Sequence, residues 1–221
     1  MTISFDAVAN SVANNTATIL PTSSHTVAAS SNRFMAVCTQ SRGSLANVRV
    51  ASLTYGGTGL TFARGDTRTD GIGTYWRTEL WYLIAPPEGA ANVAVTFTGS
   101  LAYGAATSTS FQGVHQTTPI DASAGGSGNS VGLAVTITTA TAGAWIEDCA
   151  IGRADAVGVQ GFVSVGAGQT IRTNRTTTVS NDDVGVSTVN GKSPAGSEIM
   201  DWTQSGSQDW VMSAVALKPA P

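Results

Sequence analysis

The sequence predicts an all-β protein, a two-sheet antiparallel β-sandwich of the jelly-roll type, from three observations. Apolar and polar residues alternate with period two along the chain, which is the pattern of half-buried strands, and helical periodicity is scarce. Turn residues divide the chain into about 12 to 14 short runs, a spacing typical of sandwiches. No repeat of fixed period is apparent, so neither a propeller nor a solenoid is expected. A chain of 221 residues is ordinary for one all-β domain, and we expect a single domain over residues 1–221.

The first half of the chain contains the clearest runs. Asn14 and Asn15 are predicted to form a turn, and the Gly-rich stretch 65–73 is predicted to be a polar loop. Gly56 and Gly57 suit a tight turn, because glycine adopts positive φ without steric cost. The strands expected in this half are 3–8, 17–20, 25–28, 33–39, 48–55, 60–63, 74–84, 92–98 and 105–114.

The second half begins with a Gly/Ser-rich stretch, 122–130, which we interpret as a connector between the two sheets. It is the best candidate for an internal boundary, although its length suits a sandwich crossover better than an interdomain linker. A second Ser/Gly turn is expected between 203 and 209. The strands expected here are 131–138, 143–151, 162–165, 170–176, 184–189, 199–203 and 209–217.

The aromatic stretch 74–89, TYWRTELWYLIAPPEG, is the centre of the prediction. Alternation places its odd-numbered residues, from Tyr75 to Leu83, on one face of a strand and its even-numbered residues on the other. We expect 80–84 to be the central core strand. Its leading end, Tyr75 and Trp76, is expected to reach solvent and, with Trp202, forms our candidate surface for contact or for stacking on a sugar ring, with burial in the core as the alternative for each tryptophan.

Composition excludes several classes of function. Charged residues make up 11% of the chain, against about 25% in ordinary soluble domains. Nine of the 11 basic residues are Arg and none lies between Arg77 and Arg153, so no basic track for nucleic acid is expected. No apolar stretch is long enough to span a membrane. The start resembles no signal peptide, so we expect either synthesis without a cleaved leader or a module cut from a longer chain.

The residues that could carry nucleophilic or metal chemistry are few. His25 and His115 are the only histidines and no GxSxG elbow occurs, so we expect them to be structural. Cys38 and Cys149 are expected to be buried free thiols, with one long-range disulfide as the alternative, and they form no zinc cluster. Calcium is conceivable at 66–70 and at 181–183, but both are expected to be solvated acidic turns. We therefore expect no metal and no cofactor.

The carboxylates do not form a catalytic pair in sequence. Glu147 and Asp148 are adjacent, so they point to opposite faces of a strand. Glu79 has only Arg77 as a charged neighbour on its own face. Glycosidases need two carboxyls about 5 to 9 Å apart across one cleft. The sequence therefore predicts a protein that is not an enzyme.

Several motifs together carry a resemblance to a known group of proteins. In order they are TYGG at 54–57, RTELWYLIAPPEG, VAVTFTGS, SFQGVHQTTPID, MDWTQS and a terminal DWVMSAVALKP. This series resembles the jelly-roll modules, often labelled lectin-like or concanavalin-like, of phage virion and bacterial surface proteins. The resemblance covers most of the chain and implies a non-enzymatic sandwich that decorates or adheres.

Two functional hypotheses follow from the resemblance and the composition. The first is a virion structural protein, either a capsid decoration (cement) protein or a tail or fibre component. It would be assembled in the host cytoplasm as a homo-oligomer, in contact with copies of itself and with other virion proteins. The second is a carbohydrate-binding, lectin-like module of an extracellular surface or secreted protein, with glycans as its partners.

Overall fold

The computed structural model describes residues 1–153, 162–176 and 182–221, and it confirms the all-β class. In this part of the chain there is no helix that could cross a membrane. The strands are β1 (Ser4–Ile19), β2 (Ser23–Val27), β3 (Phe34–Gly43), β4 (Val50–Tyr55), β5 (Thr58–Gly59), β6 (Thr61–Thr69), β7 (Tyr75–Ile84), β8 (Gly89–Gln112), β9 (Ile120–Thr138), β10 (Ala144–Arg153), β11 (Ser164–Val165), β12 (Gln169–Thr176), β13 (Asp182–Lys192) and β14 (Ser197–Leu217).

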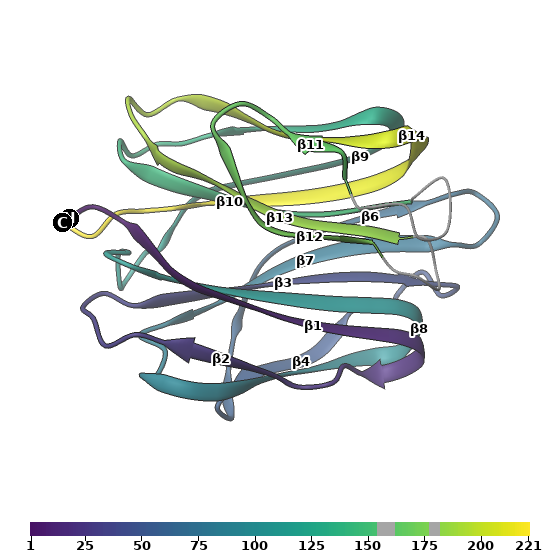
Figure 1. The fold of residues 1–221 in the computed structure, drawn as a ribbon, viewed down its shortest axis with the longest axis horizontal. Coiled ribbons are helices and arrows are strands. Elements are labelled where there is room, and N and C mark those ends of the chain that lie inside the picture. The colour runs from purple at the N-terminus through teal and green to yellow at the C-terminus, as the bar shows by residue number, and fades with distance from the viewer. Residues whose placement is uncertain (154–161, 177–181) are drawn as a thin grey trace.

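These strands form two antiparallel sheets packed face to face, which confirms the predicted sandwich. One sheet contains β1 to β8, with the path β5-β4-β8-β3-β7-β6 and with β1 and β2 also paired to β8. The other contains β9 to β14, with the path β11-β14-β10-β13-β12 and with β9 paired to β14. Each half of the chain thus builds its own sheet. Figure 1 shows the two halves stacked, with β8 in the lower half of the view and β9 in the upper half.

Four expected interruptions are absent, because long strands bend where turns were predicted. β1 runs through Asn14 and Asn15 with only a shift of register. β8 joins the expected strands 92–98 and 105–114, and β14 joins 199–203 and 209–217. The stretch 65–73 is mostly strand, since β6 extends to Thr69. In each half, the layer that faces the other half is the inner layer and the other is the outer layer. β8 and β14 pair first in the outer layer and then in the inner layer, whereas β1 and β9 run from the inner layer to the outer layer, so each sheet folds back over itself.

The Gly/Ser-rich stretch 122–130 is also strand, and its glycines have a packing role. It forms the first part of β9 and pairs with β14 from Gln208 to Ala216. A Cβ added at Gly128 would lie 2.8 Å from a ring carbon of Trp210, and one added at Gly125 would overlap the Asp66 carboxylate. Glycine is therefore required where large side chains of other strands lie against this backbone.

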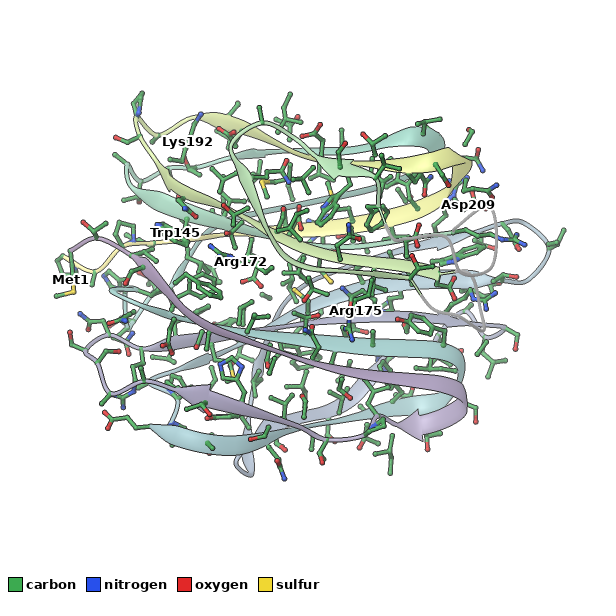
Figure 2. The ribbon with its side chains drawn as sticks, viewed as in Figure 1. Met1, Trp145, Arg172, Arg175, Lys192 and Asp209 are labelled. Atoms are coloured by element: carbon green, nitrogen blue, oxygen red, sulfur yellow. The ribbon has the colours of Figure 1, made fainter. Side chains whose placement is uncertain are left out.

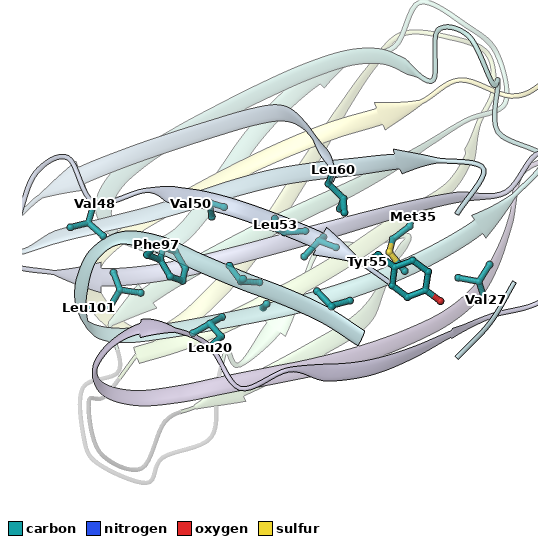
Figure 3. Close-up of a cluster of buried hydrophobic side chains, with 14 residues drawn as sticks. Leu20, Val27, Met35, Val48, Val50, Leu53, Tyr55, Leu60, Phe97 and Leu101 are labelled. Atoms are coloured by element: carbon teal, nitrogen blue, oxygen red, sulfur yellow. The ribbon is translucent and has the colours of Figure 1, made fainter. Parts of the chain in front are cut away.

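The fold has one core inside each half and a third between the halves. The N-terminal core surrounds Tyr55, Phe97 and Leu101 (Figure 3), and the C-terminal core surrounds Trp202 and Trp210. Between the sheets lie two neighbouring clusters, one of Ile3, Phe34, Ala36, Cys38, Leu80, Phe111, Val114, Trp145, Cys149, Val186, Val215 and Leu217, the other of Trp76, Tyr103, Ala105, Ile151, Val184 and Val211. This central layer joins the two sheets.

The two halves repeat the same topology. In the N-terminal sheet the strands of the inner layer follow the order β1-β8-β3-β7-β6, and in the C-terminal sheet β9-β14-β10-β13-β12. In the N-terminal half the first strand, β1, pairs with the last, β8, which also pairs with β3. In the C-terminal half the first strand, β9, pairs with the last, β14, which also pairs with β10. β9 packs over β6, and β14 packs over β7. The equivalent first strands β1 and β9 therefore lie on opposite sides of the sandwich.

The strand register and the positions of the bulges show which residues of the two halves are equivalent. Phe34 pairs with Phe111, which pairs with Phe5; Trp145 pairs with Leu217, which pairs with Ile120. A bulge follows Phe5 and Ile120, at Asp6 and Asp121, and another follows Phe62 and Ile171. From this register the equivalent pairs are Cys38 and Cys149, Arg42 and Arg153, Leu80 and Val186, Glu79 and Gly185, and Trp81 and Ser187. The chain is thus an internally duplicated fold.

Candidate functional site

The structure buries two of the three predicted contact residues and leaves the third partly exposed. Trp76 and Trp202 are each only 1% exposed, so both are core residues, the alternative given above, and the expectation that they offer ring faces to solvent is wrong. Trp76 lies between the sheets and its Nε1 donates to Asp182 Oδ1 at 3.4 Å. Trp202 lies in the C-terminal core and its Nε1 donates to Asp148 Oδ2 at 2.9 Å. Tyr75 is half-buried at the start of β7 and remains a candidate.

The faces of β7 follow the predicted alternation, but the covered end is the opposite of the expected one. Trp76 and Leu80 point to the central layer, while Trp81 and Leu83 point to the margin of the N-terminal core. Trp76 and residues 78–80 are buried, whereas residues 81–84 are only partly buried. The segment 80–84 is therefore not the central core strand, because β7 lies next to the edge strand β6.

Beside Trp81 the surface is hollowed into a cleft of about 300 Å³. Its walls are formed by the start of β4 and by the outward faces of β6 and β7. The lining residues are Arg49, Val50, Phe62, Arg77, Glu79 and Trp81. Phe62 is 47% exposed and its ring packs edge-on against Trp81, with centroids 5.2 Å apart. Sequence reasoning paired Arg77 with Glu79 correctly but missed this cleft, because Arg49 and Phe62 come from other strands.

Glu79 lies at the base of the cleft and fixes the positions of the Arg77 and Trp81 side chains. The side chain is almost fully buried, and Oε1 accepts from Arg77 Nε at 2.6 Å and from the backbone N–H of Val50 at 3.1 Å. Its Oε2 accepts from Trp81 Nε1 at 3.0 Å. Both carboxylate oxygens are thus engaged. Glu79 serves here as an anchor for Arg77 and Trp81, and its oxygens are not free to act as an acid or a base.

A Ser/His/Asp cluster occurs in the N-terminal half, but it does not have the geometry of a hydrolase triad. His25 Nδ1 and Nε2 lie 2.9 Å from the hydroxyls of Ser108 and Ser110. Asp6 accepts from Ser110 at 2.7 Å and makes no bond to the imidazole. A triad requires the carboxylate to orient the histidine, and here both serines and the histidine are buried. Burial lowers the pKa of His25, against the opposing charge of Asp6.

The second histidine has a local role. His115 Nδ1 accepts from the backbone N–H of Thr117 and of Thr118, at 3.2 and 3.1 Å. It therefore closes the turn that follows β8. This agrees with the expected structural histidine.

Glu147 and Asp148 lie on opposite faces of β10, as alternation predicts, and both are fully buried. Burial raises the pKa of each to about 7. Asp148 accepts from the N–H and the hydroxyl of Ser187, both at 2.8 Å, as well as from Trp202. Glu147 lies in the central layer, where its Oε1 accepts from Thr109 at 2.8 Å and its Oε2 has no hydrogen-bond partner among the described residues. The two groups belong to different cores and do not form a catalytic pair.

The two cysteines meet at the centre of the molecule. Both are buried free thiols, as expected. The Cys38 thiol lies 3.7 Å from the carbonyl of Asp148, and the Cys149 thiol lies 3.6 Å from that of Thr39. Burial raises the pKa of both thiols. They are equivalent residues of the two halves, so they mark where the halves face each other.

The acidic turns considered for calcium have other partners where the structure describes them. Asp66 accepts from Arg64 at 2.7 and 2.8 Å and from Ser213 at 2.7 Å. Asp70 accepts from backbone N–H groups of its own turn. Asn181 lies outside the described residues, within which no group of three or more His, Cys, Asp or Glu side chains is placed to hold a metal ion.

The surface also contains two long strands, β1 and β9, that each pair with another described strand along one edge only. β1 pairs only with β8, and β9 pairs only with β14, so no described strand pairs with the outer side of either. The 16 residues of β1 include one charged residue, Asp6, and the 19 residues of β9 include only Asp121. Neither strand contains Lys, Arg or Pro. Open edges usually carry such residues, because they block pairing with another chain.

Comparison with known proteins adds no relative. No protein-family model, no curated protein and no solved structure matches this chain.

Proposed function

We propose that the protein is a non-enzymatic structural subunit of a virion, either a capsid decoration protein or a tail or fibre component. The observation that carries the proposal is the pair of long, almost uncharged open edges, β1 and β9. They support assembly with further copies of the chain by strand addition, in which the backbone N–H and C=O groups of one edge form hydrogen bonds with those of an edge in the next copy. The virion setting is supported by the motif resemblance described above.

The position of the edges favours an extended assembly. β1 and β9 lie on opposite sides of the sandwich, so β9 of one copy can meet β1 of the next. Contacts between two different surfaces close into rings or continue as arrays and filaments, depending on the rotation between copies. Both outcomes suit a shell or a fibre. The low content of charged residues, 11%, keeps the desolvation cost of such joints small.

The self-association of the protein tests this proposal. We expect sedimentation equilibrium to show oligomers whose population grows with concentration. The double variant Ala134→Lys/Thr136→Lys, which places two cations at exposed positions of β9, should weaken association roughly tenfold or more. The matched control Ala94→Lys/Thr96→Lys alters β8 where it pairs with β4 on one side and with the end of β1 on the other, and should associate like the wild type.

Two results would contradict the proposal. One is a strict monomer at the highest soluble concentration that also fails to bind purified particles or fibres. The other is an equal loss of association in the β8 control, which would mean that charge in general, and not the β9 edge, controls assembly. A neighbouring gene for a major capsid or tail protein would support the virion setting independently.

A further inference from the structure

The cleft beside Trp81 has features that assembly through the edges does not use. Arg49 and Arg77 contribute two positive charges to its walls, and Glu79 contributes one negative charge that is buried beneath Arg77 and Trp81. No described residue forms an ion pair or a side-chain hydrogen bond with the guanidinium of Arg49. The cleft therefore has one uncompensated cation beside the exposed ring of Phe62.

The cleft is preorganised. Arg77 is held by Glu79 through Nε and by the Thr67 hydroxyl through Nη1 at 2.9 Å. The orientation of Trp81 is fixed by its own bond to Glu79. Side chains fixed before binding lose little rotamer freedom when a ligand arrives. A second hollow of about 280 Å³, bounded by residues in 45–49 and 98–99, adjoins the cleft at Arg49.

The internal duplication shows that the shared fold does not require these residues. The positions equivalent to Glu79 and Trp81 in the C-terminal half are Gly185 and Ser187. The position equivalent to Phe62 is Ile171, which is exposed to a similar extent, 45%. The same architecture is thus built with and without the anchored arginine and the aromatic pair. A role in the N-terminal half alone explains their presence.

We infer that this cleft is a binding site for an acidic saccharide, a pyranose ring that carries a carboxylate. The C–H face of a pyranose packs on an aromatic ring, which Phe62 and Trp81 provide. A guanidinium binds a carboxylate through paired charge-assisted hydrogen bonds, for which Arg49 is free. The volume suits one or two sugar rings, and the adjoining hollow gives space for a longer chain. A neutral sugar would leave the Arg49 charge without a partner.

Calorimetric titration with galacturonic acid trimer and, separately, with the uncharged galactose trimer tests the inference. At low ionic strength we expect the acidic trimer to bind at least about tenfold more tightly than the neutral one. Phe62→Ala and Arg49→Gln should each weaken binding of the acidic trimer about tenfold or more. Ile171→Ala, at the equivalent position of the other half, should bind as the wild type does. Melting curves of each variant establish that it is folded.

Three results would overturn the inference. They are no detectable binding of the acidic trimer up to about 10 mM, equal binding of the neutral trimer, and an equal loss in Ile171→Ala. A sulfated galactose trimer serves as a further ligand, because its anion is tetrahedral. Binding of the sulfated trimer in preference to the carboxylated one would also overturn the assignment. The strand-edge variants should bind the acidic trimer normally, so the two proposals can fail independently.

Discussion

Replacing Glu147 with glutamine should stabilise the protein more at high pH than at low pH, with the gain about 2 to 3 kcal/mol larger near pH 8 than near pH 5. Glu147 is fully buried, and burial raises its pKa from 4.5 to about 7. Between these two values the folded protein keeps a proton that the unfolded chain has lost. Stability is therefore greatest below the unfolded pKa and falls as the pH rises through the folded pKa. Glutamine has no such proton and removes this contribution.

The surroundings of Glu147 define what the substitution changes. The groups nearest to it are the Thr109 hydroxyl at 2.8 Å and the Cys38 thiol at 3.7 Å, with Asp148 on the same strand. The cation whose charge acts on Glu147 is Arg172. Its guanidinium lies over the Phe5 ring, 3.8 Å from the ring centroid, and Figure 2 shows Arg172 in the region where the two halves meet. Burial lowers the pKa of Arg172, against the opposing charge of Glu147. Glutamine keeps an acceptor for Thr109 and has nearly the same shape.

Urea unfolding at several pH values measures the effect. Glu88→Gln, which removes an exposed carboxylate paired with Arg33, is the matched control and should change stability by less than about 0.5 kcal/mol at every pH. A residual slope from Asp148, whose pKa burial also raises to about 7, should persist in the Glu147 variant. A uniform loss of stability at all pH values would show instead that Glu147 is ionised in the folded protein and held by Arg172.

Local geometry was predictable from the sequence because it depends only on neighbouring residues. The period of two placed Trp76 and Trp81 on opposite faces of β7 and Glu147 and Asp148 on opposite faces of β10, and the structure agrees. Which face is covered depends on the rest of the chain. Trp76 is buried because strands of the C-terminal half, through Val184 and Val211, lie against it, and alternation within β7 contains no information about them.

The duplication was hidden for a related reason. The two halves have different lengths of connection and share few side chains in equivalent positions. The series aromatic residue, cysteine and arginine occurs with the same spacing at Phe34, Cys38 and Arg42 and at Trp145, Cys149 and Arg153, but three matches do not stand out without a register. The bulges at Asp6 and Asp121, which align the halves, appear only in the strand pairing.

Turn prediction failed where glycine served packing between strands. Stretch 122–130 has the composition of a flexible connector, yet its glycines leave room for Trp210 and Asp66. The sequence also did not predict the cleft beside Trp81. Phe62 reaches Trp81 only because β6 pairs with β7, and Arg49 reaches it only because the start of β4 lies nearby. Composition alone cannot separate a glycine that bends the chain from one that admits a neighbouring side chain.

The two tryptophans of β7 provide the other large expected effect. Trp76→Ala should lower the free energy of unfolding by about 3 to 5 kcal/mol, the range for a large ring removed from a packed core. The indole is almost fully buried between the sheets, against Tyr103, Val184 and Val211. Its Nε1 also donates to Asp182. Because the ring lies where the two halves meet, its loss opens a cavity that neither half can close alone.

Trp81→Ala should cost less, about 1 to 2 kcal/mol, because the ring is only partly buried and its removal enlarges a cleft that solvent already reaches. This order is the opposite of the one expected if 80–84 were the central core strand. Denaturant unfolding of the two variants at one pH compares them directly, and equal slopes with denaturant would show that the unfolding transition is unchanged. A larger loss for Trp81→Ala than for Trp76→Ala would mean that the layer between the sheets contributes less to stability than the N-terminal core, against the packing described here.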